Sequence, residues 1–172
     1  NRVYKDLTFD NHAYTSAKKY GRWIPSDVMP FHHFFSVNKT ERYIYIPRGY
    51  FYVLHKRVHN LNLEHKVIDR TLTLNPLELE FSGTPRDYQA LAVRDVMGYP
   101  NGVLQGSTGC GKTFMGIHII QKRKQPTLII VHSKELLLQW VESIKKFLNV
   151  DAGIIGGGKC NIQPITVGII NS

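Results

Sequence analysis

Eight consecutive residues form the arrangement in this chain most capable of chemistry. They follow the pattern Gly-x-x-x-x-Gly-Lys-Thr and are Gly106, Ser107, Thr108, Gly109, Cys110, Gly111, Lys112 and Thr113. Glycines let successive backbone N–H groups curl around phosphate oxygens, and a helix that follows directs its positive end at the same anion. Lys112 would place a charge on the β- and γ-phosphates, and Thr113 would offer a hydroxyl to Mg²⁺. The pattern predicts a site for a triphosphate tail with Mg²⁺.

The flanking sequence supplies the elements that such a loop needs. Residues 103–105 are expected to form a short strand that enters the loop, after the turn signal Asn101-Gly102. An apolar helix is expected from Phe114 to Ile120, with basic residues 122–124 at its end and Pro126 as its stop. The alternative is a Gly-rich turn that contains Lys-Thr by chance, and the order strand, loop, helix argues against it.

Composition narrows the class of protein. The 172 residues carry a net charge of +9 with a pI near 9.6, a balance that suits a nucleic-acid partner. The two cysteines, Cys110 and Cys160, are expected to be reduced because a disulfide at Cys110 would block the loop, which indicates an intracellular protein. No apolar run approaches the length of a membrane span.

Residues 1–82 are predicted to form a small α+β domain with a basic helix. The expected strands cover residues 3–9, 31–37, 42–46 and 66–74, with a turn at 38–41, and the expected helices cover 14–20 and 50–59. Four aromatic residues, Phe34, Phe35, Tyr43 and Tyr45, are interpreted as core rather than as platforms for base stacking.

The helix at 50–59 has a basic face. Arg48, Lys56 and Arg57 would contact a phosphate backbone, or would form a plain solubilising face. His55 and His59 lie four apart, as metal ligands can, but the Glu of a zinc-protease helix is missing and no Cys lies nearby.

Residues 83–172 are predicted to be the first part of an α/β domain with a mostly parallel sheet and flanking helices. A helix should begin at Thr84 as N-cap, bury Tyr88, Leu91, Ala92 and Val96, and end at Gly98. An all-apolar strand at 127–131 is typical of strands buried on both faces of a parallel sheet. A long amphipathic helix follows Ser133, and short strands are expected at 152–155 and 165–170. Between those strands, residues 156–159 form a flexible, positively charged loop or a plain β-turn.

Four segments in this order resemble the motifs of superfamily-two helicases. Residues 85–89 resemble the Q motif, 106–113 motif I, 131–140 motif Ia, and 165–172 motif Ib/Ic. The resemblance is nearest to the group that holds the phage UvsW-type recombination helicases and the XPB-type repair helicases. Residues 43–54 also resemble the small N-terminal domain of the phage members. The implied fold for residues 83–172 is a RecA-like ATP-binding domain.

The resemblance implies roles for individual side chains. Gln89, with Arg86 beside it, would read the adenine base of ATP. The residues that it implies as DNA contacts are Ser133, Lys134, Thr166 and Ser172, and Lys159 is added because it lies in the positively charged loop. The alternative for Gln89 and Ser133 is that they are solvated residues at helix ends. The family's Asp-Glu-x-His motif and its second motor domain with arginine fingers are absent from these 172 residues, so the chain is expected to be a fragment that is inactive by itself.

The function predicted from these features is an ATP-dependent DNA helicase or translocase that uses Mg²⁺ and acts as a monomer on branched recombination, replication or repair intermediates. If the protein is phage-encoded, it would act in the host cytoplasm. An ATP-driven motor subunit of a restriction system and a passive DNA-binding module are the alternatives. A small-molecule P-loop kinase would place its phosphate loop near the N-terminus and would lack a Q-type helix, and neither holds here.

Overall fold

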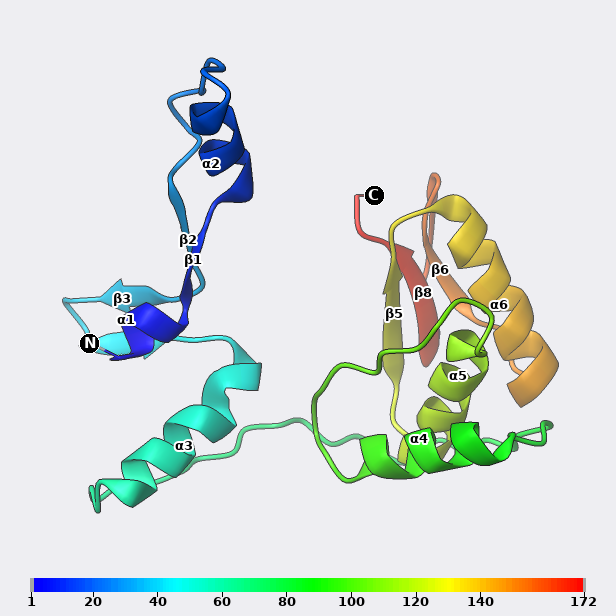
Figure 1. The fold of residues 1–172 in the computed structure, drawn as a ribbon. Helices are drawn as coiled ribbons and strands as arrows, with labels where there is room; N and C mark the ends of the chain where they lie inside the picture. Colours follow the sequence, from blue (N-terminus) through cyan, green and yellow to red (C-terminus); the bar gives the residue numbers. More distant parts are fainter. Residues whose placement is uncertain (1, 172) are drawn as a thin grey trace. The chain divides into compact units, whose positions relative to one another are not determined.

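The computed structural model describes residues 2–171, which divide into two compact units (Figure 1). The first unit comprises residues 1–67 and the second residues 68–172. None of the helices formed by the described residues is long and apolar enough to cross a membrane.

The second unit is built on a four-stranded sheet in the order β5-β8-β6-β7. The elements are α4 (Asp87–Met97), α5 (Lys112–Arg123), β5 (Thr127–Val131), α6 (Lys134–Leu148), β6 (Gly153–Gly156), β7 (Lys159–Asn161) and β8 (Ile165–Ile169). Strand β8 pairs in parallel with both neighbours, so that Val167 lies between Ile129 and Ile154. Strand β7 is antiparallel to β6. The predicted α/β fold with a mostly parallel sheet is confirmed.

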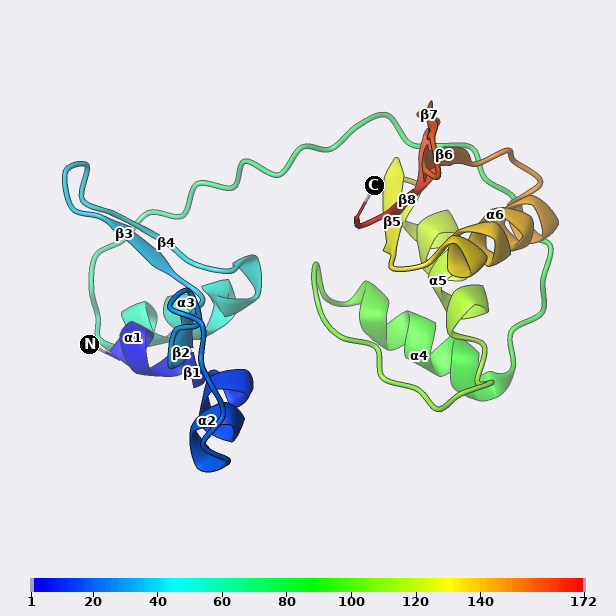
Figure 2. The same ribbon diagram turned by 90° about the horizontal axis from the view of Figure 1, so that it is seen from above.

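Helices α5 and α6 lie on one side of this sheet (Figure 2). Their inward residues Ile117 and Ile144 are fully buried, as is Val167 of β8. The other face of β5 is open, because Leu128 and Ile130 are 58% and 60% exposed. The prediction that residues 127–131 are buried on both faces is therefore wrong, since the helices of the described chain cover one face alone.

Two predicted strands do not form. Residues 102–106 have no regular structure and Val103 is 96% exposed, and residues 63–86 run without helix or strand. Both segments have suitable side chains, but a strand also needs a hydrogen-bonded neighbour, and none of the described strands pairs with either one.

The segment before α4 packs on the second unit. The N–H of Leu77 donates to the carbonyl of Lys124, and the N–H of Ser82 donates to that of Phe147, each at 2.8 Å. Phe81 lies against the core, between Phe114 and Phe147. Because these contacts tie residues 77–82 to α5 and α6, the division between the units falls at residue 67, earlier than the predicted boundary near residue 82.

The first unit consists of short elements. They are α1 (Arg2–Asp6), β1 (Thr8–Asp10), α2 (His12–Lys19), β2 (Phe31–His33), β3 (Ser36–Asn38), β4 (Tyr43–Tyr45), the 3₁₀ helix η1 (Arg48–Tyr50) and α3 (Phe51–Asn60). Strand β1 pairs with β2 and β3 with β4, both antiparallel. The predicted strand at 3–9 is mostly helix α1, and the predicted strand at 31–37 is divided between two sheets.

The aromatic residues of the first unit are not its core. Phe34, Tyr43 and Tyr45 are each more than half exposed, and Phe35 is half-buried. Their interpretation as core is wrong because two-stranded sheets of three residues leave both faces largely uncovered. The turn between β3 and β4 is confirmed, since the side-chain oxygen of Asn38 accepts from the N–H groups of Thr40 and Glu41 at 3.1 Å.

Candidate nucleotide site

The phosphate-loop residues adopt a backbone that depends on glycine. Gly109 and Gly111 have φ angles of +80° and +82°, and Gly111 is the left-handed N-cap of α5. A Cβ on Gly106 would lie 2.6 Å from the sulfur of Cys110, so a side chain at the loop's entrance would force the Cys110 side chain to move. The local sequence thus specifies the loop even though the strand before it does not form.

Lys112 spans the loop with its side chain. Its Nζ donates to the carbonyl oxygens of Gly106 at 3.1 Å and Ser107 at 2.9 Å. This places an ammonium group against the concave side of the loop, where phosphate oxygens would compete for it. The arrangement fits a polyphosphate, and Thr113 follows in the first turn of α5, where its hydroxyl would serve Mg²⁺ bound with that phosphate.

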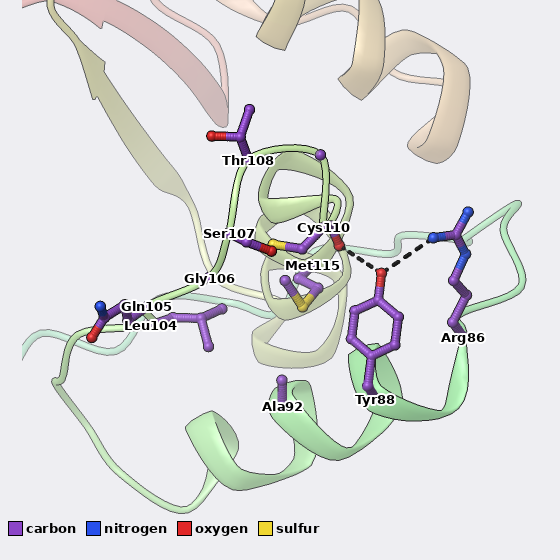
Figure 3. Close-up of a pocket in the computed structure, with 11 residues that line it drawn as sticks. Arg86, Tyr88, Ala92, Leu104, Gln105, Gly106, Ser107, Thr108, Cys110 and Met115 are labelled. Atoms are coloured by element: carbon purple, nitrogen blue, oxygen red, sulfur yellow. Dashed lines mark hydrogen bonds between the residues drawn. The ribbon is translucent and has the colours of Figure 1, made fainter.

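A cavity of about 480 Å³ lies between this loop and the start of α4 (Figure 3). Its walls are residues 104–110, Arg86, Tyr88, Ala92 and Met115. Residues about twenty positions apart in sequence therefore face one space, as a site for both ends of a nucleotide requires.

Gln89 joins α4 to the phosphate loop. Its side chain is buried, with Oε1 accepting from the N–H of Arg86 at 3.0 Å and Nε2 donating to the carbonyl of Cys110 at 3.0 Å. A Cβ on Gly111 would lie 2.5 Å from that Nε2, so the amide packs closely on the loop backbone. The amide has the donor and acceptor needed to recognise an adenine edge, and here it uses both on the main chain.

The same contacts shift the start of α4. The helix begins at Asp87 with Arg86 as N-cap, and not at Thr84 as predicted, because the Gln89 side chain satisfies the N–H of Arg86. Its buried residues are Gln89 and Val93, whereas the predicted Tyr88 and Leu91 are nearly half exposed.

Tyr88 is a site residue that the sequence analysis missed. Its hydroxyl donates to the carbonyl of Cys110 at 3.0 Å and accepts from Arg86 at 3.3 Å (Figure 3). Because Tyr88 has an aromatic ring at helical spacing, the sequence led to its interpretation as a core residue. Its hydroxyl group next to Gln89 in the sequence was the feature that could have indicated a role in the site.

Two of the predicted DNA contacts of the second unit, Ser133 and Lys134, lie at the N-terminus of α6. Ser133 caps α6, with its Oγ accepting from the N–H of Leu136 at 3.3 Å, and Lys134 is the first residue of that helix. The side chain of Glu135 shares this helix end, and hydrogen bonds from its own backbone N–H and from Ser133 lower its pKa. A negative charge is therefore favoured at this end of α6.

Thr166 is placed differently from its predicted role. It is 4% exposed, and its hydroxyl donates to the carbonyl of Gln163 at 2.7 Å. A DNA contact by Thr166 disagrees with this burial. Ser172 lies outside the described residues.

Residues 156–159 form a hairpin turn between β6 and β7. Gly157 and Gly158 have φ angles of +60° and +79°, as the two central residues of a type I′ turn require. The β-turn alternative is therefore the right one, and Lys159 is the exposed first residue of β7.

In the first unit, Arg57 is engaged within the fold. Its guanidinium pairs with the carboxylate of Asp6 and with the hydroxyl of Tyr50, which itself donates to Asp6 at 2.7 Å. The hydrogen bond from Tyr50, and then that from Arg57, lower the pKa of Asp6. The prediction that Arg57 contacts DNA is thus opposed by a structural role, whereas Lys56 and Arg48 are exposed.

The structure gives no support to a metal site at His55 and His59. Among the described residues there is no cluster of three or more His, Cys, Asp or Glu side chains that could hold a metal ion. The ring of His55 instead lies 5.2 Å from that of His65 and 5.6 Å from that of Phe51.

Comparison with known proteins agrees with this geometry. The DNA 3'-5' translocase XPB2 of Sulfurisphaera tokodaii is 39% identical over 119 residues, which are 67% of this chain and 25% of that protein. The UvrABC system protein B of Chlamydia muridarum is 32% identical over 94 residues, 55% of this chain and 14% of that protein. The chain thus spans a quarter or less of the curated relatives it matches here.

A solved structure shares the fold. The crystal structure of the UvsW helicase from Bacteriophage T4 matches 98% of this chain and 67% of that chain, with a TM-score of 0.60 and 16% identity. The fold is that of a RecA-like helicase domain, and the sequence relatives and the family profile identify the class as superfamily-two helicases. The profile described as "Type III restriction enzyme, res subunit" matches residues 82–172, and the chain belongs to this family.

Proposed function

We propose that this chain is the nucleotide-binding part of an ATP-dependent DNA helicase or translocase. The observation that carries the proposal is the phosphate loop, with Lys112 held against its concave side and Gln89 joining it to α4. The positions support a division of labour in which the loop binds the triphosphate and Thr113 binds Mg²⁺. Gln89 and Arg86 would lie at the base, as ATP use requires.

Movement along DNA would follow if the motor domains bound and released the DNA phosphates in turn. ATP binding would close this domain on a second motor domain, and hydrolysis would reopen it. In this proposal, Ser133, Lys134 and Lys159 would hold phosphates in the second unit, and Arg48 and Lys56 would do so in the first. We propose branched recombination, replication or repair intermediates as the substrate and a monomeric, intracellular motor as the working form.

The test is a Lys112→Ala substitution in the protein expressed from its full reading frame. We expect ATPase activity and unwinding of a branched DNA to fall by at least about 100-fold, since the transferred phosphate loses its positioned charge. DNA affinity should stay within about twofold, because Lys112 lies in the nucleotide site. Lys122→Ala, an exposed lysine at the other end of α5, is the matched control. Retained unwinding by the Lys112 variant would rule out the helicase function.

A motor subunit of a restriction system is the second candidate. The family match at residues 82–172 favours it, because the profile is described from such a subunit. Its nucleotide site would be the same. Cleavage of DNA during ATP hydrolysis by the full protein would identify this function, and unwinding without cleavage would favour the helicase. A protein that binds DNA but does not hydrolyse ATP under any condition would be a passive binding module.

A further inference from the structure

The carbonyl of Cys110 is held by two side chains from one helix. The Tyr88 hydroxyl and the Gln89 amide each donate to it at 3.0 Å, and Nε2 of Gln89 also donates to the Tyr88 hydroxyl at 3.4 Å. Cys110 lies between Gly109 and Gly111, whose φ angles are positive. Glycine on each side leaves the peptide plane free to rotate, so its orientation depends on what the carbonyl binds.

This orientation decides what the loop presents to an anion. In a planar trans peptide the C=O of Cys110 and the N–H of Gly111 point in opposite directions. With the carbonyl fastened to α4, the N–H of Gly111 is turned away from α4. If the plane flipped, an oxygen with a partial negative charge would replace that N–H and would repel phosphate.

The two donors are not equivalent. Gln89 is 6% exposed and its amide is also the group proposed to read the base, so recognition of adenine would draw it away from the carbonyl. Tyr88 is 45% exposed, and its hydroxyl accepts a hydrogen bond from the guanidinium of Arg86 at 3.3 Å. Its hydroxyl lies on the carbonyl of Cys110 (Figure 3), and it can stay there while Gln89 turns.

We propose that Tyr88 is a positioning residue of the phosphate loop, which keeps the Cys110 carbonyl turned outward and the Gly111 N–H available for phosphate. This inference rests on the proposed nucleotide site. It predicts that the Tyr88 hydroxyl matters for the phosphates and not for the base.

The experiment compares two ligands of the full protein, ATP and inorganic tripolyphosphate, each with Mg²⁺, by calorimetric titration. Tyr88→Phe should weaken both by a similar factor of about threefold to tenfold, the effect of one lost hydrogen bond. Tyr88→Phe combined with Gln89→Ala should weaken tripolyphosphate by more than the product of the single effects, because the carbonyl then has no donor. Tyr99→Phe, an exposed tyrosine just after α4, is the matched control and should change neither.

The outcomes separate this inference from the proposed function. If the unaltered protein binds neither ligand, the nucleotide site itself is refuted. If it binds both and Tyr88→Phe leaves tripolyphosphate affinity unchanged, the positioning role is refuted, whether or not ATP affinity falls. Replacing Tyr88 by 4-aminophenylalanine keeps an N–H donor at the ring's tip, and should restore affinity for both ligands. Failure of this rescue, with the variant folded by circular dichroism, would also overturn the role.

Discussion

Different interactions stabilise each of the two units of this protein. In the second unit, eight buried hydrophobic residues from α5, α6, β5 and β8 form one cluster, and elements of up to fifteen residues surround it. In the described part of the first unit, the buried hydrophobic residues are Leu7 and Tyr50, and the strands are three residues long. Apolar burial therefore accounts for the second unit and cannot by itself account for the first.

Polar contacts take the place of a core in the first unit. Asp6 of α1, Tyr50 of η1 and Arg57 of α3 meet in one group of mutual hydrogen bonds. The side chain of Asn11 adds a second tie, because it caps α2 and donates to the carbonyl of Met29 at 2.8 Å. The contacts of the Asp6 carboxylate depend on its charge state, whereas packing does not, and the comparison can be tested on that difference.

The largest effect is expected from a cavity in the core of the second unit. Ile144→Ala should lower the free energy of unfolding of that unit by about 2–5 kcal/mol, since Ile144 is fully buried. Trp140, which packs against the same core, reports the transition by fluorescence in urea. Trp23 should be replaced by Phe in all samples so that the signal comes from one unit. A urea midpoint for the variant equal to that of the unaltered protein would contradict the role of this core.

A smaller effect, confined to the first unit, is expected from Asp6→Asn. The folded pKa of Asp6 lies below its ordinary value of 3.8, so its contribution to stability is present above pH 3.8 and is lost as the pH falls through the folded pKa. The variant should lower the stability of the first unit at neutral pH. It should also remove the loss of stability that protonation of Asp6 causes at acid pH. Far-ultraviolet circular dichroism of residues 1–67, titrated from pH 6 to pH 2, measures it. Asp27→Asn serves as the control, and equal behaviour of the two variants would refute the role of the Asp6 group.

The smallest effect is a pH dependence within the second unit. His118 stacks on Phe81 at 4.5 Å with a buried Nδ1 that has no hydrogen-bond partner, and burial, followed by the charge of Lys122, lowers its pKa. Because the unfolded chain binds the proton more readily, stability should fall as the pH drops below about 6.5. His118→Phe should remove this slope between pH 7.5 and 5.5, as measured by the urea midpoint. An unchanged slope would assign the pH dependence to other groups.

Sequence reasoning succeeded where short-range chemistry decides structure. The turn at Asn38 follows from hydrogen bonds to residues two and three positions away, and Ser133 caps α6 in the same way. The helix from Lys112 was recognised by its motif and periodicity together. Prediction from the sequence failed at Tyr43 and Tyr45, because their exposure depends on whether other parts of the fold cover them.

The sequence alone determined the phosphate loop, because its glycine positions, its lysine and the helix after it are local features. It also determined the order of helices and strands from residue 112 onward except for β7, which lies where the sequence predicted only a loop. Only the tertiary structure decided that Tyr88 and Gln89 meet the carbonyl of Cys110 and that Arg57 is engaged by Asp6. It also decided that residues 103–105 pair with none of the described strands. The physical reason is that a hydrogen bond or an ion pair between distant segments depends on where the backbone brings them, and residue type and spacing do not encode that distance.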